Sequence, residues 1–257
     1  MKILILGGAS GFGREFVREY SKDKNEIIVV DKNKENLNIL KKQIPDIKTE
    51  CYDLTETKNL EYIYKTYKNI DLVVNSAGIG YLGNFFDVSY EEELEVLKLD
   101  VYAFHFITKK FLEEFTKRGK GGLINICSIA SFVPMPYFNM YGAVKAFDAS
   151  YTIAVRKELK KYKDVNIMAL CPGVTYTGFL PKEEFDEIVN IYGKWAICMN
   201  PNKVVKKAIK KYNRNKYIYV PGITNKIIYY FDKLSPMNVS MGIIHRLFKK
   251  AKRGIKK

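Results

Sequence analysis

The sequence predicts an α/β fold in which a doubly wound parallel sheet of about seven strands carries helices on both faces. Three observations predict this fold. Short apolar segments of strand length recur along the chain, segments with helical periodicity separate them, and several apolar segments run directly into glycine-containing or polar turns. Strands that alternate with helices form parallel sheets with right-handed crossovers, and ligands of such sheets bind at the carboxyl ends of the strands.

The first strand is predicted at Lys2–Leu6, and a glycine-rich turn leads from it into a helix that begins near Arg14. The turn reads Gly7-Gly8-Ala9-Ser10-Gly11-Phe12-Gly13. Glycine allows the backbone to approach a pyrophosphate closely, and a helix N-terminus offers free N–H groups and a partial positive charge. The turn therefore predicts a dinucleotide site. A glycine-rich turn that binds nothing is the alternative.

The second strand is predicted at Glu26–Val30 and ends at Asp31, eighteen residues after Gly13. A carboxylate in this position can hold both ribose hydroxyls of NAD, and it would repel the 2′-phosphate of NADP. Strand, glycine turn, helix, strand and acidic residue together predict a nicotinamide dinucleotide much more strongly than the glycine turn alone.

The strand and helix pattern continues to the last quarter of the chain. Further strands are predicted at Ile47–Cys51, Asp71–Val74, Leu123–Cys127, Val165–Leu170 and Tyr217–Val220. Helices are predicted over Lys58–Tyr67, from Tyr90 to about Phe115, from the region of Tyr141 to Tyr162, and near Lys203–Tyr212. The helix from Tyr90 is predicted to be one continuous element.

Tyr141 and Lys145 are four residues apart, so a helix places them on one face. An ammonium beside a phenol favours the phenolate and is expected to lower the pKa of Tyr141 from about 10, which makes the tyrosine a usable proton donor and acceptor. Ser128 follows the strand thirteen residues upstream, where its hydroxyl could bond the same substrate oxygen. A Tyr–Lys pair alone is weak evidence in a chain rich in both residue types.

Further motifs follow in a fixed order over about residues 3–178. They are Gly7, Gly11 and Gly13, Asp53, Asn75-Ser76-Ala77-Gly78, Ser128, Tyr141-Gly-Ala-Val-Lys145, Pro172-Gly173 and Thr177. In this order they resemble the short-chain dehydrogenase/reductase family, in its ordinary, non-extended branch. The resemblance implies a Rossmann-type fold and hydride transfer between a nicotinamide cofactor and an alcohol, ketone or aldehyde.

By the same resemblance, Tyr141 would be the acid/base, Lys145 would lower its pKa and hold the nicotinamide ribose, and Ser128 would steady the substrate oxygen. Asp100 falls where the family usually has an asparagine that is linked through water to the lysine. Its charge would pair with Lys145 and weaken the effect of the lysine on Tyr141. Asp100 is a candidate member of the proton relay, and a merely ion-paired carboxylate is the alternative.

The resemblance also implies a set of cofactor-binding residues. They are Gly7, Ser10, Gly11, Phe12, Gly13, Asp31, Lys32, Asp53, Leu54, Asn75, Ala77, Gly78, Tyr141, Lys145, Pro172, Gly173, Val174 and Thr177. Asp31 favours NAD, and Ser10 stands where members that prefer NADP often have a basic residue. Lys32 could hold a 2′-phosphate, so NADP remains the alternative to NAD.

One domain is expected over residues 1–257, with a substrate lid at 178–200 and a basic extension at 223–257. The lid contains Phe179, Leu180, Phe185, Ile188, Tyr192 and Trp195, and it is expected to cover Phe132, Val133, Met135 and Tyr137. Such a lining predicts a small hydrophobic carbonyl or alcohol substrate. Ordinary packing of these aromatic residues is the alternative.

The positive charge is concentrated at the end of the chain. Fifteen of the 43 basic residues and one of the 28 acidic residues lie after residue 203, so this segment carries +14 of the net charge of +15. Residues 240–257 have helical spacing with an apolar and a basic face, which predicts either binding to an anionic membrane surface or a helix that covers the substrate pocket. A nucleic-acid binder is disfavoured because no recognition motif is present.

The remaining composition is typical of a cytoplasmic enzyme. No apolar segment approaches the length of a membrane span, and the four scattered cysteines are interpreted as reduced and structural, with no metal site. A location at the inner membrane face is compatible with the basic extension. The helices at 90–115 and 141–162 match those through which the family forms dimers or tetramers, so a homo-oligomer is expected. A dinucleotide sensor without turnover is the alternative to an enzyme.

Overall fold

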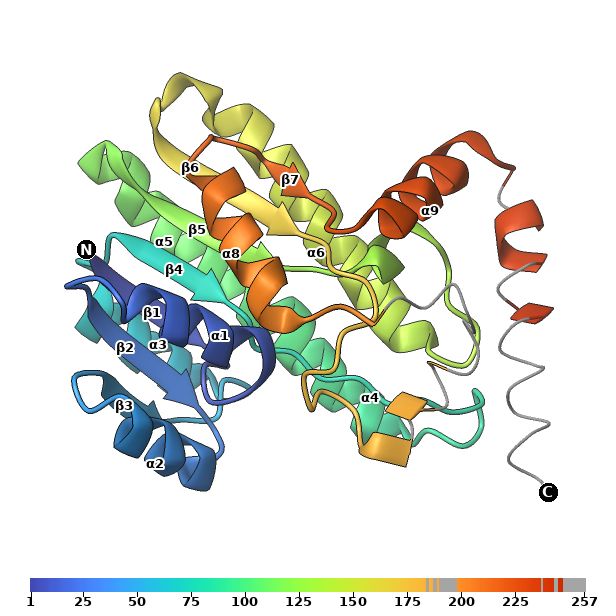
Figure 1. Cartoon of the computed structure of the whole chain (residues 1–257), viewed down its shortest axis with the longest axis horizontal. Coiled ribbons are helices and arrows are strands. Elements are labelled where there is room, and N and C mark those ends of the chain that lie inside the picture. The colour runs from blue at the N-terminus through green and yellow to red at the C-terminus, as the bar shows by residue number, and fades with distance from the viewer. Residues whose placement is uncertain (184, 187–188, 190–197, 237, 243–244, 247–257) are drawn as a thin grey trace.

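The computed structural model describes residues 1–257 except 184, 187–188, 190–197, 237, 243–244 and 247–257. Seven parallel strands form one sheet in the order β3-β2-β1-β4-β5-β6-β7 (Figure 1). The strands are β1 (Lys2–Leu6), β2 (Glu26–Asp31), β3 (Lys48–Cys51), β4 (Leu72–Asn75), β5 (Lys120–Ile126), β6 (Asp164–Leu170) and β7 (Ile218–Tyr219). The predicted seven-stranded parallel sheet is confirmed.

Helices cover both faces of the sheet because successive strand residues point to opposite sides. Ile3 and Ile5 of β1 pack into one apolar cluster with α1, α2 and α8, whereas Leu4 and Leu6 pack into a second cluster with α3 and α5. The helices are α1 (Gly11–Tyr20), α2 (Lys34–Gln43), α3 (Thr57–Tyr67), α4 (Tyr90–Val96), α5 (Phe104–Arg118), α6 (Asn139–Glu158), α8 (Pro201–Tyr212) and α9 (Ile223–Leu234). Successive residues of these strands are all apolar because helices bury both faces of the sheet.

The helix predicted from Tyr90 to about Phe115 is unbroken along the chain, but its middle is not α-helical. The structure has α4, then a π-helix, η1 (Leu97–Ala103), and then α5. A π-helical turn contains an additional residue per turn and is frequent at functional sites. Asp100 lies in the middle of η1 and is buried. The π-helical turn therefore occurs at the one buried carboxylate of the helical segment from α4 to α5.

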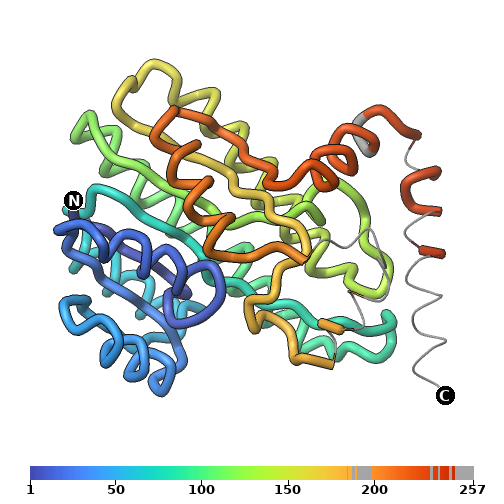
Figure 2. Tube along the Cα trace, in the orientation of Figure 1, coloured from blue at the N-terminus to red at the C-terminus, as the bar shows by residue number. Residues whose placement is uncertain are grey.

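Helix α9 lies at the edge of the molecule, beyond β7 (Figure 2). Most of the predicted amphipathic helix at 240–257 lies outside the described residues. Among the described residues, no helix has the length and apolar character needed to cross a membrane.

Candidate active site

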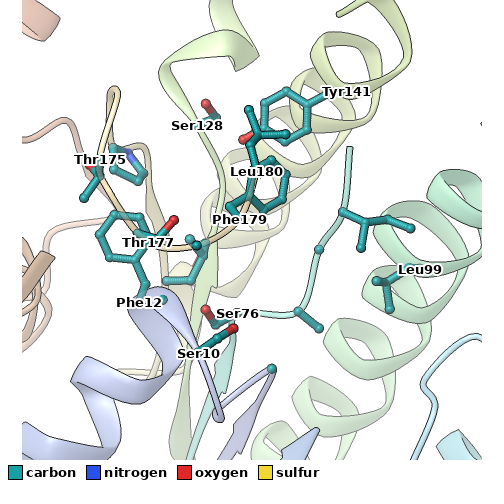
Figure 3. A pocket seen from close by; sticks show the side chains of 18 of the residues that line it. Ser10, Phe12, Ser76, Leu99, Ser128, Tyr141, Thr175, Thr177, Phe179 and Leu180 are labelled. Atoms are coloured by element: carbon teal, nitrogen blue, oxygen red, sulfur yellow. The ribbon is translucent and has the colours of Figure 1, made fainter. Parts of the chain in front are cut away.

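A cleft of about 450 Å³ lies at the carboxyl ends of the central strands. All predicted site residues line it except Gly13, Asn75 and Asp100. Figure 3 shows Ser128 and Tyr141 at one end of the cleft and Ser10 and Phe12 at the other. The fold therefore brings residues from seven separate stretches of the sequence into one cleft.

The three predicted residues that do not line the cleft lie just behind its wall. A Cβ on Gly13 would stand 2.1 Å from the carbonyl oxygen of Gly7, so this glycine allows α1 to pack on the turn. Asn75 is buried at the end of β4, and its Nδ2 has no hydrogen-bond partner among the described residues. Asp100 is buried against Lys145.

The glycine turn fits a pyrophosphate. Ser10 precedes α1 but its side chain does not cap the helix, and the first turn of α1 has no acidic residue. Gly11 has φ +50°, and a Cβ there would lie 3.1 Å from the Cβ of Thr177. The N-terminus of α1 thus presents its partial positive charge toward the cleft without a competing carboxylate.

Asp31 and Lys32 at the end of β2 have different partners. Asp31 accepts hydrogen bonds from the backbone N–H groups of Ala9 and Asn33, both at 3.0 Å. The Lys32 ammonium lies 3.0 Å from Oε1 of Glu95, whose Oε2 accepts a hydrogen bond from Tyr81. Asp31 is thus fixed at the turn, and Lys32 already has a carboxylate partner.

The ring of Tyr141 is held between two aromatic side chains. The Phe138 ring stacks on it with a centroid distance of 4.3 Å, and the Phe179 ring is tilted by 51° against it with a centroid distance of 5.3 Å. The ammonium of Lys145 is 5.8 Å from the centre of the Tyr141 ring. The predicted pair on one face of a helix is therefore confirmed in its geometry.

Lys145 is buried between two carboxylates. Its Nζ is 2.7 Å from Oδ1 of Asp100 and 2.9 Å from Oδ2 of Asp148, and it also donates to the carbonyl oxygen of Ile126 at 3.5 Å. The predicted pairing of Asp100 with Lys145 is confirmed. Asp148 was not predicted, although its position three residues after Lys145 on the same helix face was the signal that could have identified it.

The loop after β4 closes over this buried cluster. The backbone N–H of Ile79 donates to Oδ2 of Asp100 at 2.9 Å. A Cβ on Gly78 would lie 2.7 Å from Oδ1 of Asp100 and 3.3 Å from Nζ of Lys145. The absence of a side chain at Gly78 thus allows the loop that faces the cofactor site to lie directly on the ion pair.

The predicted lowering of the Tyr141 pKa is wrong in this structure. Burial raises the pKa of Tyr141; Lys145 and a hydrogen bond with Ser128 lower it, but Asp100 and Asp148 act in the same direction as burial. The ammonium cannot outweigh burial because two carboxylates surround it. Tyr141 is therefore held in its protonated form at neutral pH.

The titration of the buried cluster follows from the same arrangement. Burial lowers the pKa of Lys145, but the Asp100 and Asp148 carboxylates outweigh it and raise that pKa well above its usual value. Burial raises the pKa of Asp100, and Lys145 offsets only part of this increase. Burial also raises the pKa of Asp148, to about 7, again with partial compensation by Lys145. Oδ1 of Asp148 has no hydrogen-bond partner among the described residues. Asp148 therefore changes its charge near neutral pH.

The predicted substrate wall is only partly correct. Phe179, Leu180 and Phe185 of the lid line the cleft, but of the four residues expected beneath them only Met135 does. The Phe132 ring packs instead on Tyr229 of α9, with a centroid distance of 4.5 Å. Val133 is buried in an apolar cluster with Met135 and Phe138, and Tyr137 stacks on His245. The lid residues Ile188, Tyr192 and Trp195 lie outside the described residues.

Comparisons with known proteins are consistent with this geometry. The chain is 25% identical over 230 residues to the 7beta-hydroxysteroid dehydrogenase of Clostridium sardiniense, covering 87% of this chain and 86% of that protein. It is 27% identical over 176 residues to an uncharacterized oxidoreductase of Schizosaccharomyces pombe, which covers 66% of this chain and only 59% of the relative.

Two solved structures share the fold. A short-chain dehydrogenase from Sphingobium yanoikuyae in complex with NADPH has a TM-score of 0.80 at 21% identity, with 95% of each chain covered. A Burkholderia phymatum protein of the same kind in complex with NAD has a TM-score of 0.80 at 16% identity, with 94% of each chain covered. The two structures contain different dinucleotides, so the fold alone does not select the cofactor.

The family model for short chain dehydrogenases matches residues 1–187, which include the glycine turn, Ser128, Tyr141 and Lys145. This match extends over more than half of the chain. The chain belongs to the short-chain dehydrogenase/reductase family of NAD(P)-dependent oxidoreductases.

Proposed function

We propose that this protein reduces an apolar ketone or aldehyde, or oxidises the corresponding alcohol, with NAD(H) as the preferred cofactor. The observation that carries the proposal is the meeting of Ser128, Tyr141 and Lys145 at one end of a cleft whose other end is the uncapped N-terminus of α1. The apolar side chains of Met135, Phe179 and Leu180 at the catalytic end favour a substrate with a hydrophobic body.

The bound nicotinamide supplies the hydride in reduction and accepts it in oxidation. Tyr141 donates its phenolic proton to the carbonyl oxygen of the substrate, and the Ser128 hydroxyl positions that oxygen. A raised Tyr141 pKa keeps the phenol protonated, which is the state needed for reduction. The Lys145 ammonium stabilises the phenolate that remains when Tyr141 has given up its proton, and the Asp100 and Asp148 carboxylates offset part of this stabilisation.

Two features of the β2 end support NAD over NADP. The carboxylate of Asp31 would repel a 2′-phosphate, and Glu95 holds the Lys32 ammonium that would otherwise attract one. We expect NADH to bind at least about tenfold more tightly than NADPH. The measurement is a titration with each nucleotide, followed by the fluorescence of Trp195 and the tyrosines. Tighter binding of NADPH would contradict the proposed preference, and binding of neither would contradict the proposed function.

Variants of Asp31 and Glu95 test whether these two residues cause the preference for NADH over NADPH. Asp31→Asn should shift the affinity ratio toward NADPH by about tenfold, because it removes the repelling charge. Glu95→Gln should shift the ratio in the same direction because it releases Lys32. Asp46→Asn, which changes an exposed aspartate by the same chemistry, is the matched control and should leave the ratio unchanged.

We further propose that Asp148 is a positioning residue that acts through Lys145. When Asp148 is ionised, two carboxylates neutralise the ammonium, so less of its charge favours the Tyr141 phenolate. In Asp148→Asn the pH at which the rate of alcohol oxidation reaches half of its plateau should fall by about one unit, since Tyr141 acts as the base in this direction and its pKa falls. Asp148→Glu should restore the profile, and Asp164→Asn on an exposed aspartate should not move it. An unchanged profile in Asp148→Asn would leave Asp148 with a role in packing alone.

A further inference from the structure

Helix α9 exposes an apolar stripe that has no partner in the chain described. Ile223, Ile227, Tyr230, Phe231 and Leu234 are 80%, 62%, 59%, 47% and 86% exposed. At 3.6 residues per turn these five side chains fall within an arc of about 100° on the helix. Single exposed apolar residues are ordinary on protein surfaces, whereas five on one helical face indicate a binding surface.

The opposite face of α9 packs on Phe132 and on Gly173, and Gly173 lines the cleft. The Tyr229 ring packs on Phe132 at 4.5 Å, and the Asn225 amide donates to the carbonyl oxygen of Pro221 at 2.8 Å. A Cβ on Gly173 would lie 2.4 Å from the Asn225 side chain, so this contact is close. These contacts fix the rotation of α9 about its axis, which leaves the apolar stripe exposed. Figure 1 shows α9 at the periphery of the molecule.

The positive charge of the C-terminal quarter of the chain indicates which kind of partner binds this stripe. The segment from residue 204 to residue 257 carries a charge of +14, and the exposed Lys226 lies on α9 itself. A second copy of the chain on this surface would bring two such segments together, and like charges repel. An anionic lipid surface offers both an apolar layer for the stripe and negative headgroups for the basic residues.

We propose that α9 lies in the surface of an anionic lipid bilayer, with its apolar stripe (Ile223, Ile227, Tyr230, Phe231 and Leu234) immersed and the Lys226 ammonium at the negative headgroups. Gly173, which lines the cleft, lies against the opposite face of α9, so the thickness of this helix separates that part of the cleft wall from the bilayer. The lipid binding itself does not depend on the proposed reaction.

Co-sedimentation of the full-length protein with vesicles tests the proposal. The vesicles are phosphatidylcholine alone or phosphatidylcholine mixed with phosphatidylglycerol, each at low and high salt. Binding is expected only to the mixed vesicles, and it should weaken as salt screens the charges. Ile227→Ser should weaken binding to the mixed vesicles by about tenfold. Ile39→Ser, on the exposed face of α2, is the matched control and should bind as the unchanged protein does.

Cofactor binding and the oligomeric state are measured on the same samples. Unchanged NADH affinity in Ile227→Ser shows that the variant is folded, so a loss of vesicle binding is then assigned to the stripe. Equal vesicle binding by Ile227→Ser and Ile39→Ser, or no binding to the mixed vesicles, would overturn the proposal. A change of oligomeric state in Ile227→Ser with unchanged vesicle binding would also overturn it and assign the stripe to a second copy. Leu234→Ser, which changes the most exposed residue of the stripe, provides an independent second variant.

Discussion

Tyr141→Phe should lower the rate of ketone reduction by about 10²- to 10⁴-fold, because the ring keeps its packing while the proton donor is lost. Phe138 and Phe179 pack against the ring of Tyr141, and a phenylalanine ring keeps these contacts. The measurement is the single-turnover oxidation of NADH at saturating substrate. The substrate is the ketone reduced fastest in a screen of cyclic and aromatic ketones.

The affinity of Tyr141→Phe for NADH should change little, and this separates a lost proton donor from a lost cofactor site. Tyr90→Phe removes the hydroxyl of an exposed tyrosine on α4 and should leave the rate unchanged. If Tyr141→Phe kept more than about a tenth of the activity, Tyr141 would not be the group that protonates the substrate.

Lys145→Met should be strongly destabilising, and this second prediction concerns the fold independently of catalysis. The replacement leaves Asp100 and Asp148 buried without their cation, which costs about 3–5 kcal/mol when the carboxylates are ionised. Loss of the ammonium raises the folded-state pKa of both carboxyls further above the unfolded value of about 3.9. The loss of stability should therefore be small near pH 4 to 5 and grow as the pH rises toward about 8.

Urea unfolding at several pH values measures this dependence. Lys65→Met, which breaks the exposed pair with Glu61, is the control and should change stability by less than about 1 kcal/mol at any pH. Adding Asp148→Asn to Lys145→Met should recover part of the loss near pH 8, since only one buried carboxylate then remains. A loss of stability that is equal at all pH values would mean that the two carboxylates are not the cause.

Local sequence predicted most of the sheet correctly. Ile3, Leu4 and Ile5 form an unbroken apolar segment because β1 is buried on both faces, and the glycine turn after it requires backbone geometry that few other residues adopt. Such signals involve neighbouring residues, so the sequence displays them directly. Helix α2 gives a weaker signal, with only Leu37 and Leu40 buried, and it was not predicted.

The sequence predicted most of the residues that meet at the candidate site, but it did not predict the electrostatics of their side chains. Tyr141 and Lys145 are related by helical spacing, and their meeting follows from that spacing alone. Asp100 is 45 residues from Lys145 in sequence, and its contact depends on the π-helix η1 and on the packing of η1 against α6. The direction of the Tyr141 pKa shift depends on how completely this packing removes water from the tyrosine. The spacing of residues along the sequence does not predict the extent of burial.

The sequence by itself determined the order of strands and helices, the glycine turn, and the identity of the groups that line the cleft. It could do so because periodicity and turn chemistry act over a few neighbouring residues. Only the tertiary structure decided that Lys145 is shared by two buried carboxylates, that Glu95 holds Lys32, and that α9 turns its apolar stripe outward. Each of these depends on burial and on distances between segments far apart in the chain, and both are set when the layers of the fold pack together.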